Sequence, residues 1–65
     1  MPNALSIRPG YWRVTAADGR VLGNIEAVGD DGRPEYRANR FRPSVVGYAP
    51  LGRFSDLAVA IDAFR

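Results

Sequence analysis

The sequence contains no cysteine, no histidine and no lysine. Without cysteine, disulfides and thiolate chemistry are excluded, and without histidine the commonest general acid–base and most zinc sites are excluded as well. No hydrophobic run approaches the roughly 18 residues that a membrane-spanning helix needs. The segment from Met1 to Gly10 has no charged stretch followed by an apolar one, so we expect no signal peptide, no membrane contact and a cytoplasmic location.

The chain is also short of large apolar side chains. Its 65 residues are enough for one domain, near the lower size limit for independent folding. Apolar residues make up 46% of the chain, but nine of them are alanines, so the expected core is small. Self-association would be a ready source of extra stability for such a chain.

What the sequence does have is arginine. All nine basic residues are arginine, and the formal net charge is +2. Five of these arginines lie between positions 33 and 53, where the only acid is Glu35. The planar guanidinium group presents donors that suit phosphate, carboxylate and guanine edges. A coding bias toward arginine would give the same composition, so composition alone leaves both explanations open.

The pattern of residues predicts an α+β fold, with a three-stranded antiparallel meander sheet and one C-terminal helix packed on one of its faces. Alternating β-branched and aromatic residues mark the first strand, the second follows an Asp-Gly turn, and the third follows a Gly-Asp-Asp-Gly turn. Asp18-Gly19 is a strong signal for a two-residue hairpin turn. Ser55 is the expected N-cap of the helix, whose apolar residues recur at spacings of four and three. The predicted segments are a lead-in arm (1–10), the sheet (11–41, with strands at 11–16, 21–28 and 35–41), a loop or short fourth edge strand (42–54) and the helix (55–65).

Two-residue turns at Asp18-Gly19 and Asp31-Gly32 would fix the strand register. One face of the sheet is then apolar and suits coverage by the helix side chains Leu57, Ile61 and Phe64. Gly23 lies on this face and indicates either a bulge or a close approach of the helix. The predicted apolar face consists of Trp12, Val14, Val21, Ile25, Ala27, Tyr36 and Ala38.

The same register predicts a polar opposite face. Arginine can pair with guanine and asparagine with adenine, so such a sheet could bind nucleic acid, most simply the major groove of duplex DNA. The predicted base-contacting residues are Arg13, Asn24, Arg37 and Asn39, and the predicted phosphate contacts around them are Arg20, Arg33, Arg40, Arg42 and Arg53. The alternative is that Arg37–Glu26 and Arg13–Asn24 are ordinary cross-strand pairs on a solvated surface.

A second hypothesis is a protein-interaction or self-associating module, such as a phage-encoded modulator of a host protein or a homodimer. Its predicted contact residues are Tyr11, Thr15, Leu22 and Phe41, which would be partly exposed on the polar face. No nucleophile, metal-ligand spacing or phosphate-binding loop occurs in the sequence, so we expect no enzymatic activity, no metal and no cofactor.

The segment from Leu51 to Phe64 resembles part of the small sheet-plus-helix DNA-binding domains of the ethylene-response-factor and integrase arm-binding types. In those domains a strand ending in a Leu-Gly-x-Phe-like segment precedes a polar cap and an alanine-rich helix. Here Leu51-Gly52-Arg53-Phe54, Ser55 and the alanines at 58, 60 and 63 match that outline. Small uncharacterised actinobacterial and phage proteins also share the Trp-x-Val strand and the Asp-Gly turn. The resemblance implies a sheet that binds a DNA groove, although the register above places Trp12 on the core side.

Overall fold

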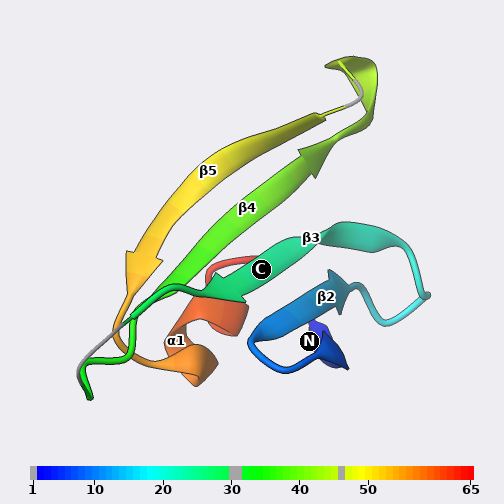
Figure 1. Ribbon diagram of the computed structural model, residues 1–65. Helices are drawn as coiled ribbons and strands as arrows, with labels where there is room; N and C mark the ends of the chain where they lie inside the picture. Colours follow the sequence, from blue (N-terminus) through cyan, green and yellow to red (C-terminus); the bar gives the residue numbers. More distant parts are fainter. Residues whose placement is uncertain (1, 30–31, 46) are drawn as a thin grey trace.

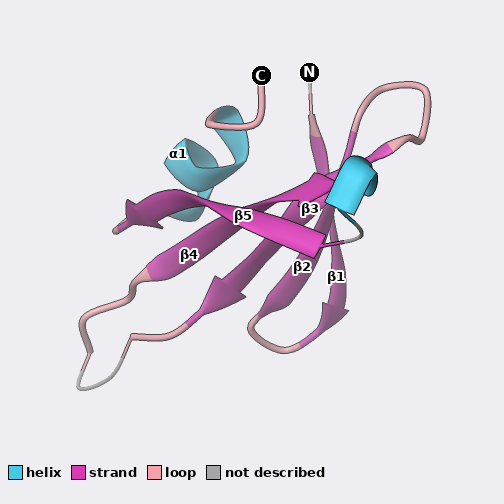
Figure 2. Cartoon of the chain, turned by 90° about the horizontal axis from the view of Figure 1, so that it is seen from above, coloured by secondary structure: helices cyan, strands magenta, loops and turns pink. Residues whose placement is uncertain are grey.

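The computed structural model describes residues 2–29, 32–45 and 47–65, and it is an α+β domain with one sheet and one short helix. The sheet is antiparallel and open, and its five strands follow one another in chain order (Figures 1 and 2). The α+β meander was therefore predicted correctly, but the sheet has five strands where the sequence predicted three or four. The elements are β1 (Asn3–Arg8), β2 (Tyr11–Thr15), β3 (Val21–Ala27), β4 (Tyr36–Arg42), a 3-10 turn η1 (Pro43–Val45), β5 (Gly47–Phe54) and α1 (Leu57–Asp62).

The predicted lead-in arm is in fact the first edge strand. β1 pairs antiparallel with β2, with Ala4 opposite Val14 and Ser6 opposite Trp12. The connection runs through Pro9 and Gly10, and Gly10 has φ of +78°, a conformation that glycine adopts without strain. Nearly every residue of β1 is exposed, although Leu5-Ser6-Ile7-Arg8 alternates between apolar and polar types as a strand does.

The β2–β3 hairpin differs from the prediction in two ways that cancel. Ala16 N donates to Arg20 O (2.8 Å) and Gly19 N donates to Ala16 O (2.9 Å), so the loop contains three residues, 17–19. A β-bulge then leaves Leu22 without a partner, between the pairs Thr15–Val21 and Val14–Gly23. The register from Val14 onward is consequently the one that a two-residue turn would have produced.

The β3–β4 pairing has the predicted register, with Ile25 opposite Ala38 and Ala27 opposite Tyr36. The turn expected at 29–32 falls partly on residues 30 and 31, which lie outside the described residues. Val28 N donates to Glu35 O (2.9 Å), which continues the same register one pair beyond Ala27–Tyr36.

The strand that the sequence only suggested between 42 and 54 is β5, and it forms the second edge of the sheet. It pairs with β4 alone, and a bulge at Leu51 separates the pairs Asn39–Pro50 and Ala38–Gly52. An edge strand tolerates a proline because its outer side needs no donor. The pairing of β4 and β5 continues beyond the last β3–β4 pair, Gly23–Arg40, so these two strands project past the rest of the sheet (Figure 1).

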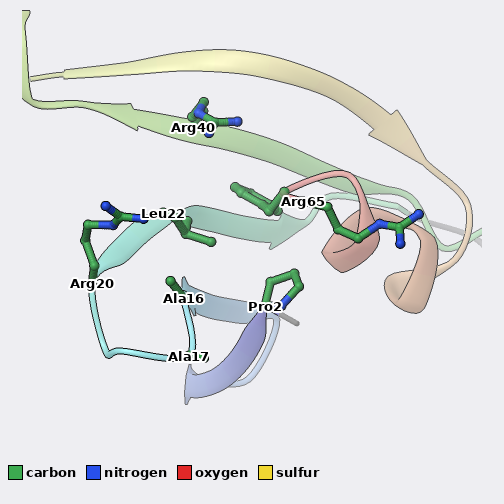
Figure 3. Close-up of a pocket in the computed structure, with 8 residues that line it drawn as sticks. Pro2, Ala16, Ala17, Arg20, Leu22, Arg40 and Arg65 are labelled. Carbon is green, nitrogen blue, oxygen red and sulfur yellow. The ribbon is translucent and has the colours of Figure 1, made fainter.

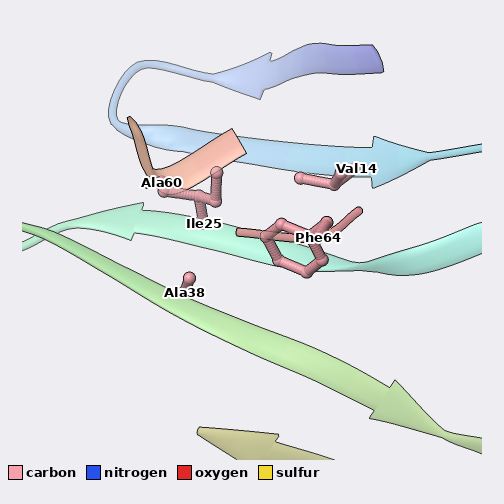
Figure 4. Close-up of a cluster of buried hydrophobic side chains, with 5 residues drawn as sticks. All are labelled: Val14, Ile25, Ala38, Ala60 and Phe64. Carbon is pink, nitrogen blue, oxygen red and sulfur yellow. The ribbon is translucent and has the colours of Figure 1, made fainter. Parts of the chain in front are cut away.

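The core lies between the sheet and α1 and is small. Figure 4 shows Ala60 and Phe64 from the helical segment over Val14, Ile25 and Ala38 from the three central strands, and all five are buried. Partly buried residues surround this cluster: Trp12, Leu22, Tyr36, Leu51, Phe54, Leu57 and Ile61. The predicted apolar face is therefore mostly right.

Two residues of the predicted apolar face are exceptions. Val21 is 40% exposed, because the bulge turns it out of the core, and Ala27 is exposed at the end of β3. The close approach predicted at Gly23 is real, since the ring of Phe64 covers it.

The helix runs from Leu57 to Asp62, so it is shorter at both ends than the predicted range 55–65, and its cap is a different residue. Asp56 has extended dihedrals (φ −134°, ψ 128°), and its carboxylate accepts from Ala58 N at 2.8 Å. Asp56 therefore occupies the N-cap position that the sequence assigned to Ser55. α1 is short, and within the described parts of the chain no helix has the length and apolar character to cross a bilayer.

Candidate nucleic-acid interface

The face of the sheet opposite α1 is not covered by any described element, and we call it the open face (Figure 2). The pairings place Arg13, Asn24 and Asn39 side by side across β2, β3 and β4. A second row runs beside it, formed by Tyr11, Glu26, Arg37 and Arg53. The structure thus brings together the four residues that the sequence proposed as base contacts.

Two asparagines at the centre of the open face hold each other in place. Asn39 Nδ2 donates to Asn24 Oδ1 at 3.1 Å, and both side chains are partly buried. This bond uses one donor of Asn39 and one acceptor site of Asn24. The amide nitrogen of Asn24 and the amide oxygen of Asn39 have no hydrogen-bond partner among the described side chains, so the pair keeps one donor and one acceptor available.

The second row holds two arginines, Arg37 and Arg53, and two glutamates lie beside them, Glu26 and Glu35. Arg37 lies directly between Glu26 and Arg53, and the side chain of Arg53 contacts Glu35 (Nη1 to Oε2, 3.6 Å). Two like charges opposite each other are unfavourable without a counter-charge. Within residues 2–29, 32–45 and 47–65, neither Arg13 nor Arg37 forms an ion pair, so the Arg37–Glu26 pair of the alternative interpretation is aligned but not formed.

Aromatic side chains lie on both sides of these rows. At the β1 side, the guanidinium of Arg8 stacks over the ring of Tyr11, 4.4 Å from its centroid. At the projecting end of β4 and β5, the rings of Phe41 and Tyr48 lie 5.5 Å apart, and Tyr48 is 55% exposed. Exposed rings next to guanidinium groups provide flat apolar surfaces beside positive charge.

Four predicted phosphate-contacting arginines do not lie on the open face. Arg40 is opposite Gly23 in the row that ends at the buried Val14, so its side chain leaves the sheet on the helix side. Alternation along β4 places Arg42 on that side too. Arg20 lines a cavity with Phe64, and Arg33 is exposed in the β3–β4 connection.

The protein-contact row predicted from the sequence is also altered. The bulge removes Leu22 from the open face and packs it against the core, while Val21 takes its place opposite Thr15. Tyr11 and Phe41 remain on the open face. The row of Thr15, Leu22 and Phe41 is therefore not formed.

Sequence reasoning missed the contribution of β1 to this face. Arg8 and Leu5 join it through β1, and Leu5 is 63% exposed opposite Arg13. The available signal was Pro9-Gly10, a dipeptide that commonly marks a turn and that would have implied a strand before it.

No cluster of metal-ligating side chains occurs in the part of the chain that the structure describes. Comparisons with protein families, with curated proteins and with solved structures find no match to the chain. The assignment of a function consequently depends on the geometry of the chain itself.

Proposed function

We propose that the protein is a small nucleic-acid-binding module that uses its open face. The observation that supports this most is the placement of Arg13 and Arg37, two arginines without a described ion-pair partner, next to the hydrogen-bonded Asn24–Asn39 pair: Arg13 lies opposite Asn24, and Arg37 lies two residues from Asn39 on β4. Arginines supply phosphate contacts, and a fixed amide pair can discriminate between base edges.

The shape of the open face favours a single strand over a duplex. Adjacent strands lie about 4.8 Å apart, so five strands span roughly 19 Å between the two edges. The major groove of B-DNA is only about 12 Å wide, so the whole face is too broad to enter it. An extended single strand can instead lie across the sheet, with bases stacked on the guanidinium of Arg8, which covers the ring of Tyr11, and on the Phe41–Tyr48 pair.

Salt-dependent binding tests this proposal. Fluorescence anisotropy with a labelled single-stranded oligonucleotide of about ten nucleotides should give an affinity that falls as salt rises, with a log–log slope of about −0.7 per phosphate contacted. Arg37→Ala and Arg13→Ala should each weaken binding and reduce that slope by about 0.7. A duplex of the same sequence should bind more weakly than the single strand.

The matched control is Arg42→Ala, which removes the same charge from an exposed position on the other side of the sheet. Equal losses from Arg42→Ala and Arg37→Ala would indicate attraction by net charge without a defined site. Absence of binding to either form at low salt would refute the proposal, because phosphate contacts are strongest there.

A second candidate is self-association through β1. Its outer edge is unpaired, and it carries two exposed large apolar residues, Leu5 (63%) and Ile7 (43%). The opposite edge, β5, is interrupted by Pro50 and a bulge, both of which discourage pairing with another chain. A second copy of the chain could therefore add its β1 to this edge.

Sedimentation over a range of concentrations distinguishes this candidate. The candidate is supported if the parent protein is a dimer and the Ile7→Lys variant is a monomer, since a charge on an edge strand opposes the addition of another strand. A protein that stays monomeric at high concentration excludes it.

A further inference from the structure

On the helix side of the sheet, a cavity of about 270 Å³ lies between the sheet and the end of the helical segment (Figure 3). Its apolar wall includes Ala16, Leu22 and the ring of Phe64, and its polar wall includes Arg20 and Arg40. We call it the arginine cavity. It lies on the opposite side of the sheet from Arg13 and Arg37, so it is separate from the proposed nucleic-acid interface.

The cavity exists because the sheet divides at this point. The last β3–β4 pair is Gly23–Arg40, beyond which β4 continues with β5 while β3 turns back toward β2. The bulge at Leu22 reverses the alternation of the residues that precede it in β3. Leu22 and Arg20 therefore line the helix-side cavity, where a regular strand would have directed them to the open face.

Within the described residues, no acidic side chain neutralises Arg20 or Arg40 in the arginine cavity. Neither Arg20 nor Arg40 forms an ion pair with any described acidic residue. The nearest acid in sequence, Asp18, accepts a bond from the backbone nitrogen of Arg20 at 3.0 Å. Arg65 also lines the cavity, but its Nε contacts Asp62 at 3.1 Å, and Figure 3 shows its guanidinium directed away from the other two.

A second cavity of about 500 Å³ adjoins the first. It shares Arg20, Leu22 and Arg40 and adds apolar surface from Phe41 and Pro43. The two arginines therefore stand between two hollows that are both partly apolar. A ligand with an anionic group at the arginines has apolar protein surface available on either side.

We propose that the arginine cavity binds a small phosphate monoester with an aromatic or aliphatic body. A phosphate monoester carries about −1.5 to −2 charges at neutral pH, which matches two guanidinium groups, and its oxygens accept paired N–H donors from arginine. Leu22 and the apolar residues of either hollow contact the body of the ligand. A monoanionic carboxylate leaves part of the positive charge unpaired and binds more weakly.

Titrations with simple probes test the proposal. Chemical-shift titration with phenyl phosphate should perturb Arg20, Leu22 and Arg40 at saturable concentrations. Inorganic phosphate should bind more weakly because it lacks the apolar body, and benzyl alcohol should not bind because it lacks the charge. Arg40→Ala and Arg20→Ala should each weaken phenyl phosphate binding by about ten- to a hundredfold, the usual effect of losing a charge-assisted hydrogen bond.

Arg33→Ala is the matched control, because it removes an equal charge from an exposed position in the β3–β4 connection, outside both proposed sites, and should leave phenyl phosphate binding unchanged. Arg40→Lys should restore only part of the affinity, since lysine keeps the charge but not the planar fork. The proposal is refuted if the folded protein shows no saturable shifts with phenyl phosphate, or if Arg33→Ala weakens binding as much as Arg40→Ala does. Because nucleic-acid binding depends on Arg13 and Arg37, the two proposals can fail separately.

Discussion

Gly23 leaves almost no room for a side chain, so Gly23→Ala should destabilise the fold strongly for the addition of one methyl group. A Cβ at this position would lie 2.6 Å from Phe64 Cε2 and 3.0 Å from Arg40 Cα, and would overlap the carbonyl oxygen of Asn39. Two of these three obstacles are backbone atoms of β4. The clash therefore cannot be relieved by a rotamer change and requires β4 or Phe64 to move.

The size of the effect follows from two opposing contributions. Forcing a methyl group into a packed site costs typically about 1–3 kcal/mol, and a backbone obstacle places this case toward the upper end. Replacing glycine in a strand by alanine recovers about 0.5–1 kcal/mol of conformational entropy. The net loss is then about 1–2 kcal/mol. A domain of this size has roughly 3–10 kcal/mol in total, so the loss is a substantial part of it.

Thermal unfolding followed by circular dichroism measures this loss. At about 4–8 °C per kcal/mol for a small domain, Tm should fall by about 5–15 °C. The control is Gly19→Asn, because nothing lies within 4 Å of that position and asparagine tolerates its φ of +89°. Gly19→Asn should melt within a few degrees of the parent. If Gly23→Ala melts at or above the parent temperature, the close approach of β4 and Phe64 to Gly23 is wrong.

Two further predictions concern the helix cap and the asparagine pair. Asp56→Ala should lower the free energy of unfolding by about 1 kcal/mol in urea titrations, whereas Ser55→Ala should change it by no more than about 0.5 kcal/mol. The reverse order would show that Ser55 is the N-cap. Asn39→Ala should cost about 0.5–1.5 kcal/mol because it leaves the partly buried Asn24 amide without its partner. The double variant with Asn24→Ala should cost less than the sum of the two single changes, and strict additivity would show that the pair does not interact in solution.

The sequence predicted the centre of the sheet well because apolar alternation and turn residues agree there. Ile25 and Ala38 were placed opposite each other on the core face, and both are buried. The predicted β2–β3 register was correct although the predicted two-residue turn was not, since the three-residue loop and the bulge at Leu22 offset each other. Val21 and Leu22 are both apolar, so the pattern could not show which of them faces the core.

The positions of the candidate-site residues that follow from regular strand register were predicted correctly. The positions that depend on a β-bulge were not. Arg13, Asn24, Arg37 and Asn39 follow from regular alternation, and the structure places them together. Arg20 lies on the helix side because of the bulge at Leu22, and no residue type in this stretch predicts that bulge. By register, Arg40 already lay opposite Gly23 on the core face of the sheet. Its charge nevertheless led to the prediction that it contacts phosphate beside the polar face.

The edge elements were the least predictable. β1 carries almost no buried side chain, and its alternation of apolar and polar residues covers only the four residues from Leu5 to Arg8. At the start of the helix, serine and aspartate are both good caps, and their order in the chain does not decide between them. Tertiary packing fixes the choice, because Leu57 must reach the core cluster from the first helical position.

The strict chain order of the strands bears on how quickly the protein can fold. Each strand pairs only with the strand that precedes or follows it, so every connection closes a short loop and no pairing has to wait for a distant segment. Folding rates rise as contacts become more local, so this sheet should assemble faster than a sandwich built from the same number of strands. The hairpins can form independently and associate in any sequence. Exchange of backbone amides should be slowest in β3, which has a partner on each side, and fastest at the two outer strands.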